Sequence, residues 1–175
     1  MLSALVLASD SHVRVSASPE AMARTLAALV PAAVQGVIKD VTLASLLGAD
    51  QALYIADHAG CALAEADTPE AVLKAGLALT RGDIILVLRA GYAPEAGFME
   101  EVSDQFERSA IRAPRSAFLR AVSETFLTRL LPALTHVEGV IVRRSDIAQS
   151  ITSLVDLRRQ LVAPVAFRCR LRRVV

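Results

Sequence analysis

Short apolar runs alternate with helix-start signals along the chain. Residues 2–8 form an apolar run that predicts a buried strand. Ser18-Pro19-Glu20 then predicts a helix start, because serine caps the first turn, proline suits the first helical position and an acid favours the positive end of the helix dipole. Apolar residues follow at helical spacing as far as Pro31, where we expect the helix to end: Met22, Leu26, Leu29 and Val30.

The same alternation continues through the middle of the chain. Residues 37–44 and 61–65 predict two further strands, and between them we expect Asp50 to cap a short helix that Gly60 closes. Thr68-Pro69-Glu70 repeats the helix-start signal, and we expect that helix to end at Gly82. Residues 84–88, IILVL, are a continuous apolar run, which is typical of a central parallel strand covered on both faces.

The second half of the chain predicts three more helices and two more strands. We expect Pro94 to open a helix that buries Phe98, Val102 and Phe106, and a further helix over residues 116–131. Residues 139–142 predict a strand, and Ser145 is expected to cap a helix that reaches residue 161. Apolar residues alternate with arginines in the tail, which predicts a half-exposed strand. This order predicts one α/β domain over residues 1–175, a three-layer α/β/α sandwich with a mainly parallel sheet.

Composition narrows the class of protein. Of the 175 residues 54% are hydrophobic and the mean hydropathy is +0.46, which excludes a largely disordered chain. No apolar run approaches the length of a membrane-spanning helix, and the first residues lack the basic region of a signal peptide. Cys61 and Cys169 stand in no metal-ligand or redox spacing, so we expect buried thiols and a reducing, cytoplasmic setting.

The net charge of +1 hides an asymmetry. Residues 1–107 hold 6 Lys/Arg and 14 Asp/Glu, a net −8, whereas residues 108–175 hold 13 Arg and 4 Asp/Glu, a net +9. These opposed charges permit a homo-oligomer, and the basic part suits either a phosphate-bearing ligand or solvated helix faces. Aromatic residues are only 4% of the chain, which argues against nucleic acid as a partner. The tail arginines fit either peripheral contact with an anionic membrane or the outer face of an edge strand: Arg168, Arg170, Arg172 and Arg173.

Other catalytic and metal-binding patterns are weak. His12, His58 and His136 are widely spaced and form no zinc pattern. Asp10 and Ser11 adjoin His12, but neighbours in sequence rarely adopt triad geometry, and no nucleophile elbow is present. The glycine-rich loops of dinucleotide and ATP sites are also missing from the sequence.

Several short segments occur in one order: a helix opening at Asp50, an Ala75-Gly76 step in a later helix, and Arg81-Gly82-Asp83 before IILVL. The opening LSALVLASD and the later VEGVIVRRSDI fit the same order. In these segments the chain resembles family 2 glycosyltransferases. The resemblance implies the GT-A, Rossmann-like fold of nucleotide-diphospho-sugar transferases, with Ser9 and Asp10 lining the nucleotide cleft at the end of the first strand.

The sequence departs from the family at three acidic positions. Ser45 stands where the resemblance implies the aspartate that binds the nucleotide base. Residues 88–92 read LRAGY, with Gly91 in place of the aspartate that would hold a divalent metal against the diphosphate. The Glu-Asp pair that supplies the family's general base falls near residues 153–154, which leaves Asp156 as the remnant acid nearby.

Three functions stay open. The first is a degenerate glycosyltransferase-like protein that binds a nucleotide-sugar or a protein partner, with no cofactor, no divalent metal and no glycosyl transfer. The second is an active metal-independent transferase in which Arg89 faces the diphosphate, since guanidinium groups suit phosphate oxygens; Arg89 would otherwise cap its strand and face solvent. The third is a peripheral membrane or scaffold protein that uses the arginine-rich C-terminal third. No catalytic residue is assigned, and enzyme activity stays open.

Overall fold

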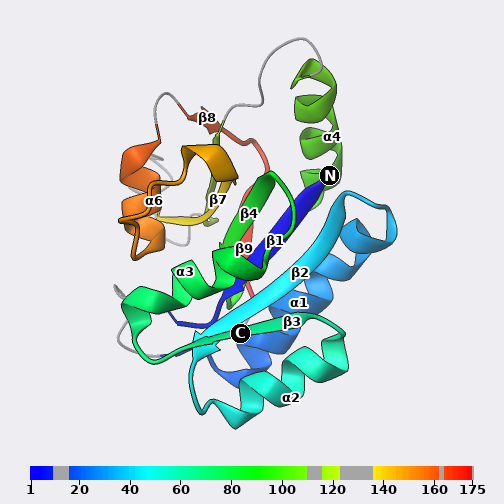
Figure 1. Ribbon diagram of the computed structural model, residues 1–175. Helices are drawn as coiled ribbons and strands as arrows, with labels where there is room; N and C mark the ends of the chain where they lie inside the picture. The colour runs from blue at the N-terminus through cyan, green and yellow to red at the C-terminus, as the bar shows by residue number, and fades with distance from the viewer. Residues whose placement is uncertain (10–15, 110–115, 123–135, 162–163, 175) are drawn as a thin grey trace.

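A seven-stranded sheet in the order β3-β2-β1-β4-β7-β6-β8 forms the centre of the molecule (Figure 1). The computed structural model describes residues 1–9, 16–109, 116–122, 136–161 and 164–174. The strands of the sheet are β1 (Leu2–Leu7), β2 (Ile38–Leu46), β3 (Ala62–Ala66), β4 (Ile84–Arg89), β6 (Ala117–Arg120), β7 (Val137–Arg143) and β8 (Val165–Ala166). A separate two-stranded ladder joins β5 (Tyr92–Pro94) to β9 (Leu171–Arg173).

The sheet is mainly parallel, as the sequence predicts. Strands β3, β2, β1 and β4 run parallel to one another, and β6 runs parallel to β8. Strand β7 is antiparallel to both of its neighbours, β4 and β6. Every residue of β1 is buried, as expected for a central strand with both faces covered.

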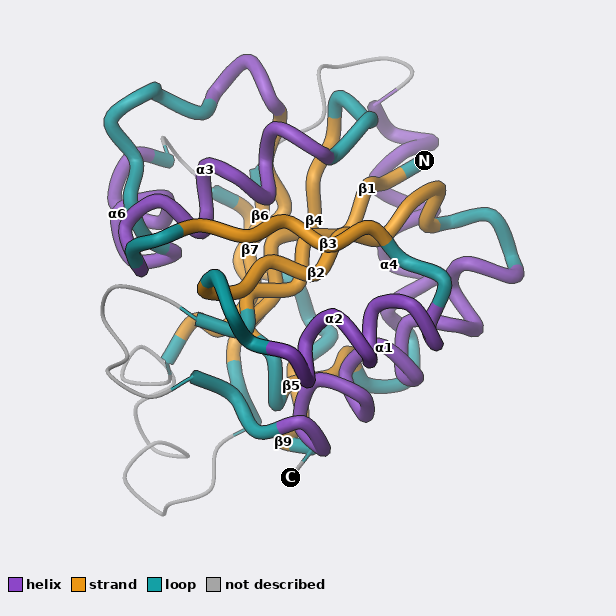
Figure 2. The backbone as a smooth tube through the Cα atoms, turned by 60° about the horizontal axis from the view of Figure 1, so that its bottom comes forward, coloured by secondary structure: helices purple, strands orange, loops and turns teal. Residues whose placement is uncertain are grey.

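Helices cover both faces of the sheet (Figures 1 and 2). One core cluster packs α1 (Pro19–Val34), α2 (Asp50–Ala59) and α4 (Phe98–Ser109) against one face. A second cluster packs α3 (Pro69–Leu79) and α6 (Leu154–Gln160) against the other. Successive residues of β1 alternate between these clusters, because neighbouring side chains of a strand point to opposite faces. The predicted three-layer α/β/α sandwich is therefore confirmed.

Local sequence signals fix several helix ends correctly. The Ser18 hydroxyl accepts a hydrogen bond from the Ala21 N–H at 3.2 Å, which caps α1. Gly60 ends α2 with a left-handed φ of 64°. The expected end of α1 at Pro31 is wrong, because the helix continues to Val34. Pro31 is exposed inside the last turns, where its ring removes one i→i−4 hydrogen bond but does not end the helix.

Four other expected boundaries are wrong. Pro94 lies in β5 rather than at a helix start, and α3 ends at Leu79, before Gly82. Residues 117–120 form β6 instead of a helix, because they pair with β7 and β8 in the sheet. Ser145 lies in a short 3-10 helix (Arg144–Asp146), and the helix that follows begins only after Ser153.

The other helix expectations have mixed outcomes. Asp50 is the first residue of α2 rather than its cap, which is Ala49. Phe98 and Val102 are buried in α4 as expected, whereas the side chain of Phe106 lies outside the described residues.

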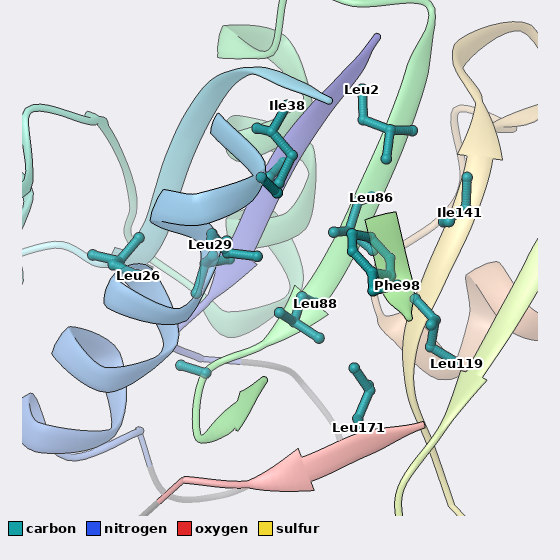
Figure 3. Packing of buried hydrophobic residues seen from close by; sticks show 14 of the residues in the cluster. Leu2, Leu26, Leu29, Ile38, Leu86, Leu88, Phe98, Leu119, Ile141 and Leu171 are labelled. Carbon is teal, nitrogen blue, oxygen red and sulfur yellow. The ribbon is translucent and has the colours of Figure 1, made fainter. Parts of the chain in front are cut away.

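The tail keeps the predicted alternation but not a single strand. Phe167, Cys169 and Leu171 are buried, and the intervening arginines are exposed. The chain is irregular between β8 and β9. Figure 3 shows Leu171 pointing from β9 toward Leu88 and Leu119, so the tail contributes to the core.

The two cysteines differ in burial. Cys169 is buried as expected, whereas Cys61 is only half-buried. No helix among the described residues is long and apolar enough to cross a membrane.

Candidate functional site

The carboxyl ends of three parallel strands bring predicted site residues to one edge of the sheet. Ser9 follows β1, Ser45 lies near the end of β2, and Arg89 is the last residue of β4. Leu7 pairs with both Ala44 and Arg89, so the three strands end at the same level. Open α/β sheets bind ligands at this edge. We refer to it as the carboxyl edge; Asp10 and His12, which follow Ser9, lie outside the described residues.

Three of the predicted residues at the carboxyl edge are buried. Ser9 is 6% exposed and Ser45 is 2% exposed, and Gly91 is also buried. The hydroxyl groups of Ser9 and Ser16 share a hydrogen bond of 2.8 Å. These residues therefore offer little polar surface to a ligand. Arg89 differs, because 22% of its side chain is exposed.

Arg89 forms an ion pair with Glu138, an acid that the sequence analysis did not single out. The Arg89 Nη1 atom lies 2.7 Å from the Glu138 Oε2 atom, and the Glu138 side chain is 6% exposed. Leu88 pairs with Gly139 in the antiparallel ladder, which places Arg89 beside Glu138 at the start of β7. A buried carboxylate is stable only with a partner of opposite charge. The interpretation of Arg89 as a solvent-facing strand cap is therefore wrong.

One sequence signal could have identified Glu138. It is the only charged residue in the otherwise apolar segment 137–142, VEGVIV. An ionised carboxylate within a buried strand is costly unless it is paired, so its presence indicates a basic partner nearby. The sequence alone does not say which of the many arginines that partner is.

Gly91 occupies a turn that disfavours an aspartate. Its φ is +93°, a conformation that residues with a side chain rarely adopt. The Gly91 N–H donates to the buried Thr25 hydroxyl at 2.9 Å, and its carbonyl accepts from the Val174 N–H at 2.8 Å. A side chain would find room, since an added Cβ meets Ala21 only at 3.7 Å. The backbone conformation, rather than crowding, therefore makes glycine the suitable residue.

The arginine-rich tail reaches the carboxyl edge. In the β5–β9 ladder Tyr92 pairs with Arg173 and Ala93 pairs with Arg172, directly after Gly91. Both arginine side chains are exposed, while Leu171 is fully buried. The fold therefore places Arg172 and Arg173 beside the residues that follow the turn after Arg89. The sequence did not predict this position.

Asp156 acts as part of a helix cap. The Thr152 and Ser153 hydroxyls donate to Asp156 Oδ2 at 2.9 and 2.8 Å. The Asp156 N–H donates to the Ser153 hydroxyl at 3.0 Å, which caps the first turn of α6. These contacts account for the acid at this position, and its role as a remnant general base stays a prediction.

Two of the three histidines, His58 and His136, lie in the described part of the chain. His58 is exposed in the last turn of α2, where its Nδ1 lies 2.9 Å from the Tyr54 carbonyl oxygen. His136 is exposed just before β7. Among the described residues no group of three His, Cys, Asp or Glu side chains could hold a metal ion. The metal-free interpretation itself stays a prediction.

Solved structures share this arrangement of strands and helices. Glucosyl-3-phosphoglycerate synthase from Mycobacterium tuberculosis, in complex with Mn²⁺, uridine diphosphate and phosphoglyceric acid, matches 82% of this chain and 56% of its own, at 13% identity and a TM-score of 0.53. HddC from Yersinia pseudotuberculosis matches 98% of this chain and 92% of its own, at 12% identity and a TM-score of 0.60. No family model and no curated protein matches the chain. The fold is GT-A-like.

These identities show the fold alone, which is the fold that the resemblance implies. This chain spans little more than half the length of the mycobacterial synthase, at 56%. In the GT-A-like fold the carboxyl edge is the expected place for a ligand, because it is where the parallel strands end. Function must therefore be argued from the residues at that edge and not from the fold.

Proposed function

We propose that this chain is a glycosyltransferase-like protein that binds a nucleotide-diphospho-sugar or a similar anionic ligand without metal-dependent glycosyl transfer. The observation that carries the proposal is the Arg89–Glu138 ion pair at the carboxyl edge. Uridine diphosphate and Mn²⁺ are both present in the mycobacterial synthase structure. We infer that this chain binds a similar nucleotide without the metal.

The charges at the carboxyl edge support an anion over a divalent cation. Magnesium and manganese require carboxylate or other oxygen ligands. Glu138 is a buried acid in this region, and its carboxylate already faces the Arg89 guanidinium. A divalent ion bound there would meet that positive charge. A diphosphate would instead be attracted chiefly by the exposed Arg172 and Arg173 of β9, since Arg89 and Glu138 together carry no net charge.

Calorimetric titration with UDP- and GDP-sugars tests the proposal. We expect binding that is equal with Mn²⁺ and with a chelator, and no release of sugar or nucleoside diphosphate. Metal-dependent micromolar binding accompanied by turnover would contradict it, as would the absence of binding to any of these ligands.

Paired charge variants locate the site. Arg172→Ala with Arg173→Ala removes two exposed charges beside the carboxyl edge, and we expect at least a tenfold loss of affinity. Lys74→Ala with Arg81→Ala removes two exposed charges elsewhere and should leave affinity unchanged. Equal effects from the two pairs would indicate a non-specific charge effect and would contradict a site at the carboxyl edge.

A metal-independent transferase is the second candidate. It is favoured by the partial exposure of Arg89, whose side chain is 22% accessible at the end of β4. The residues that would bind the diphosphate are the same, and the difference lies in the reaction. Release of nucleoside diphosphate from a nucleotide-sugar in the presence of a chelator would favour this candidate over the first.

Contact with an anionic membrane is the third candidate. Arg168, Arg170, Arg172 and Arg173 are all exposed along the tail. Such a cluster would place the protein at the membrane periphery in the cytoplasm. Co-sedimentation with phosphatidylserine vesicles should then be strong at low salt and should fall steeply as salt rises. No binding at low salt would exclude it.

A further inference from the structure

The tail alternates between buried apolar residues and exposed arginines, and Arg173 interrupts this alternation. Cys169 and Leu171 are buried, whereas Arg170 and Arg172 are exposed. Residues two apart in a strand have their side chains on the same side. Position 173 therefore belongs to the side of Leu171, where the pattern predicts an apolar residue. An arginine stands there instead.

The Leu171 side of β9 lies against the core. Leu171 is fully buried, and Figure 3 shows its side chain pointing toward Leu88, near the end of β4. A Cβ added to Gly139 would lie 3.0 Å from the Leu171 Cδ1 atom, so Leu171 packs directly over Gly139. Leu88 precedes Arg89 and Gly139 follows Glu138. Leu171 therefore covers the strand positions next to the ion pair.

Cross-strand pairing places Arg173 on the same side. Directly paired residues of an antiparallel ladder have their side chains on one face, and Arg173 pairs with Tyr92. Tyr92 is half-buried and packs against the core cluster that contains Leu88 and Leu171. Arg173 thus lies on the core side of the ladder, about 7 Å along β9 from Leu171. Because Arg173 is exposed, the closed core ends between these two residues.

The end of β9 is fixed to the carboxyl edge by backbone hydrogen bonds. The Val174 N–H donates to the Gly91 carbonyl oxygen at 2.8 Å. The Gly91 N–H in turn donates to the buried Thr25 hydroxyl of α1 at 2.9 Å. Arg173 lies between the Val174 bond and the pairing of β9 with β5, so its backbone has a fixed place beside the turn.

Arg173 also supplies the net positive charge that the ion pair lacks. The Arg89 guanidinium and the Glu138 carboxylate neutralise each other. In the part of the chain that the structure describes, no hydrogen bond or ion pair engages the Arg173 side chain. A guanidinium presents a planar fork of N–H donors that suits two phosphate oxygens. Arg172 carries the same charge but pairs with Ala93, on the other side of the ladder.

We propose that Arg173, and not Arg172, contacts the diphosphate of the ligand at the carboxyl edge. This inference rests on the proposed function and names the residue that binds the anion. Both arginines attract an anion from a distance, because the field of a charge is not directional. Only Arg173 lies on the side of β9 that faces β4. If the arginines served only to protect an edge strand, the two residues would be equivalent.

Single variants, titrated by calorimetry with UDP and GDP in the presence of a chelator, test the inference. We expect Arg173→Ala to weaken binding at least about tenfold, because it removes a charged hydrogen-bond donor. Arg172→Ala is the matched control, with the same change of charge one residue away, and should weaken binding less than about threefold. Equal losses, or a larger loss for Arg172→Ala, would overturn the inference and leave the proposed function standing. No binding of either nucleotide to the wild-type chain would overturn both.

Two further measurements separate direct contact from long-range attraction. Arg173→Lys keeps the charge but lacks the planar fork, so we expect an affinity between those of the wild-type chain and Arg173→Ala. Phenylglyoxal modifies exposed guanidinium groups, and bound nucleotide should protect Arg173 more than Arg172, as read by mass spectrometry. Full recovery by Arg173→Lys, or equal protection of the two arginines, would overturn a direct contact. Thermal unfolding of each variant checks that the fold is retained.

Discussion

The two edges of the sheet each hold an arginine with a structural role, but the partners differ. At the amino edge Arg144 donates to the carbonyl oxygen of Leu77 at 2.9 Å and to the hydroxyl of Thr80 at 2.7 Å. At the carboxyl edge Arg89 meets the buried carboxylate of Glu138. Carbonyl oxygens are neutral and can accept hydrogen bonds from water if the arginine is lost, whereas a buried carboxylate left without its counter-charge is costly. The same residue type therefore has different consequences when removed.

The amino edge also gives the Arg81-Gly82-Asp83 segment a structural role. The Gly82 N–H donates to the Ser3 hydroxyl at 2.7 Å, and the Ser3 hydroxyl donates to Asp40. The Arg81 N–H donates to the same Asp40 carboxylate at 3.2 Å. A Cβ on Gly82 would lie 2.6 Å from the Ser3 oxygen. The Arg81-Gly82-Asp83 segment is thus used to join β1, β2 and β4, at the edge opposite the candidate site.

The largest expected effect is that of Arg89→Ala. This change leaves the Glu138 carboxylate buried without its counter-charge, and we expect a loss of about 3–5 kcal/mol in the free energy of unfolding. Denaturant titration measures it. The double variant Arg89→Leu with Glu138→Leu removes both charges and should recover most of that loss. If Arg89→Ala costs less than about 1 kcal/mol, the pair is solvated and its structural importance is contradicted.

Arg89→Ala is a poor test of ligand binding, because the change is also expected to destabilise the fold. A variant that unfolds also loses binding, so Arg89→Ala alone would not separate the two roles. The exposed Arg172 and Arg173 are better probes, because they lie on β9 with no buried carboxylate paired to them in the described contacts.

A smaller effect is expected for Arg144→Ala. The guanidinium bonds the end of α3 through the oxygens of Leu77 and Thr80, and hydrogen bonds from charged groups contribute about 1.5–3 kcal/mol. Water can replace part of these contacts, so we expect a loss of about 2 kcal/mol, measured by denaturant titration. Arg144→Lys should recover only part of it, since lysine lacks the planar fork. A loss equal to that of Arg89→Ala would contradict the contrast between the two edges.

Gly91→Ala should have a smaller effect still. A side chain at φ +93° is strained, at a cost of about 1–2 kcal/mol, although no atom blocks the added Cβ. Thermal unfolding measures the loss. Gly91→Asp should show a similar loss and should not create Mn²⁺ binding, because a single carboxylate beside Arg89 is a poor cation site. Micromolar Mn²⁺ binding by Gly91→Asp would show that the site has lost only one ligand.

Sequence reasoning predicted features that depend on nearby residues. The Ser18 cap, the Gly60 end of α2 and the apolar strand β4 each follow from a few adjacent residues. It failed for residues 117–120, whose strand conformation depends on pairing with β7 and β8. At the candidate site the family resemblance, rather than the residue pattern, placed Ser9, Ser45 and Arg89 in one cleft, and Glu138 was missed. An ion pair between two strands depends on their register, which the sequence alone does not state.

The smallest expected effect concerns Cys169, which reports whether the tail stays beside the carboxyl edge. Both oxygens of the Glu101 carboxylate accept backbone N–H groups of the tail, from Arg168 and Cys169, at 2.8 Å each. Burial raises the pKa of the Cys169 thiol to about 11, with a further increase from the nearby Glu101, while the bond to the Glu95 carbonyl lowers it. The native thiol should therefore stay protonated at pH 8 and react slowly with iodoacetamide.

Labelling of a Cys61→Ser variant, which keeps Cys169 as its only thiol, measures this. The reaction should accelerate as the pH rises from 9 toward 11, because the pKa of the folded thiol is about 11, against 9.0 for an unburied thiol. Over the same window the folded state loses stability, since its raised pKa favours the protonated form and rising pH favours the unfolded thiolate. Cys169→Ser should remove that part of the pH dependence.

Glu101→Gln should speed labelling at pH 8 if the carboxylate holds the tail in place, because the amide offers only one acceptor oxygen for two N–H donors. Equal labelling rates in Glu101→Gln and in its Cys61→Ser parent would show that Glu101 is not needed to hold the tail. The core contacts of Leu171 alone would then fix the positions of Arg172 and Arg173.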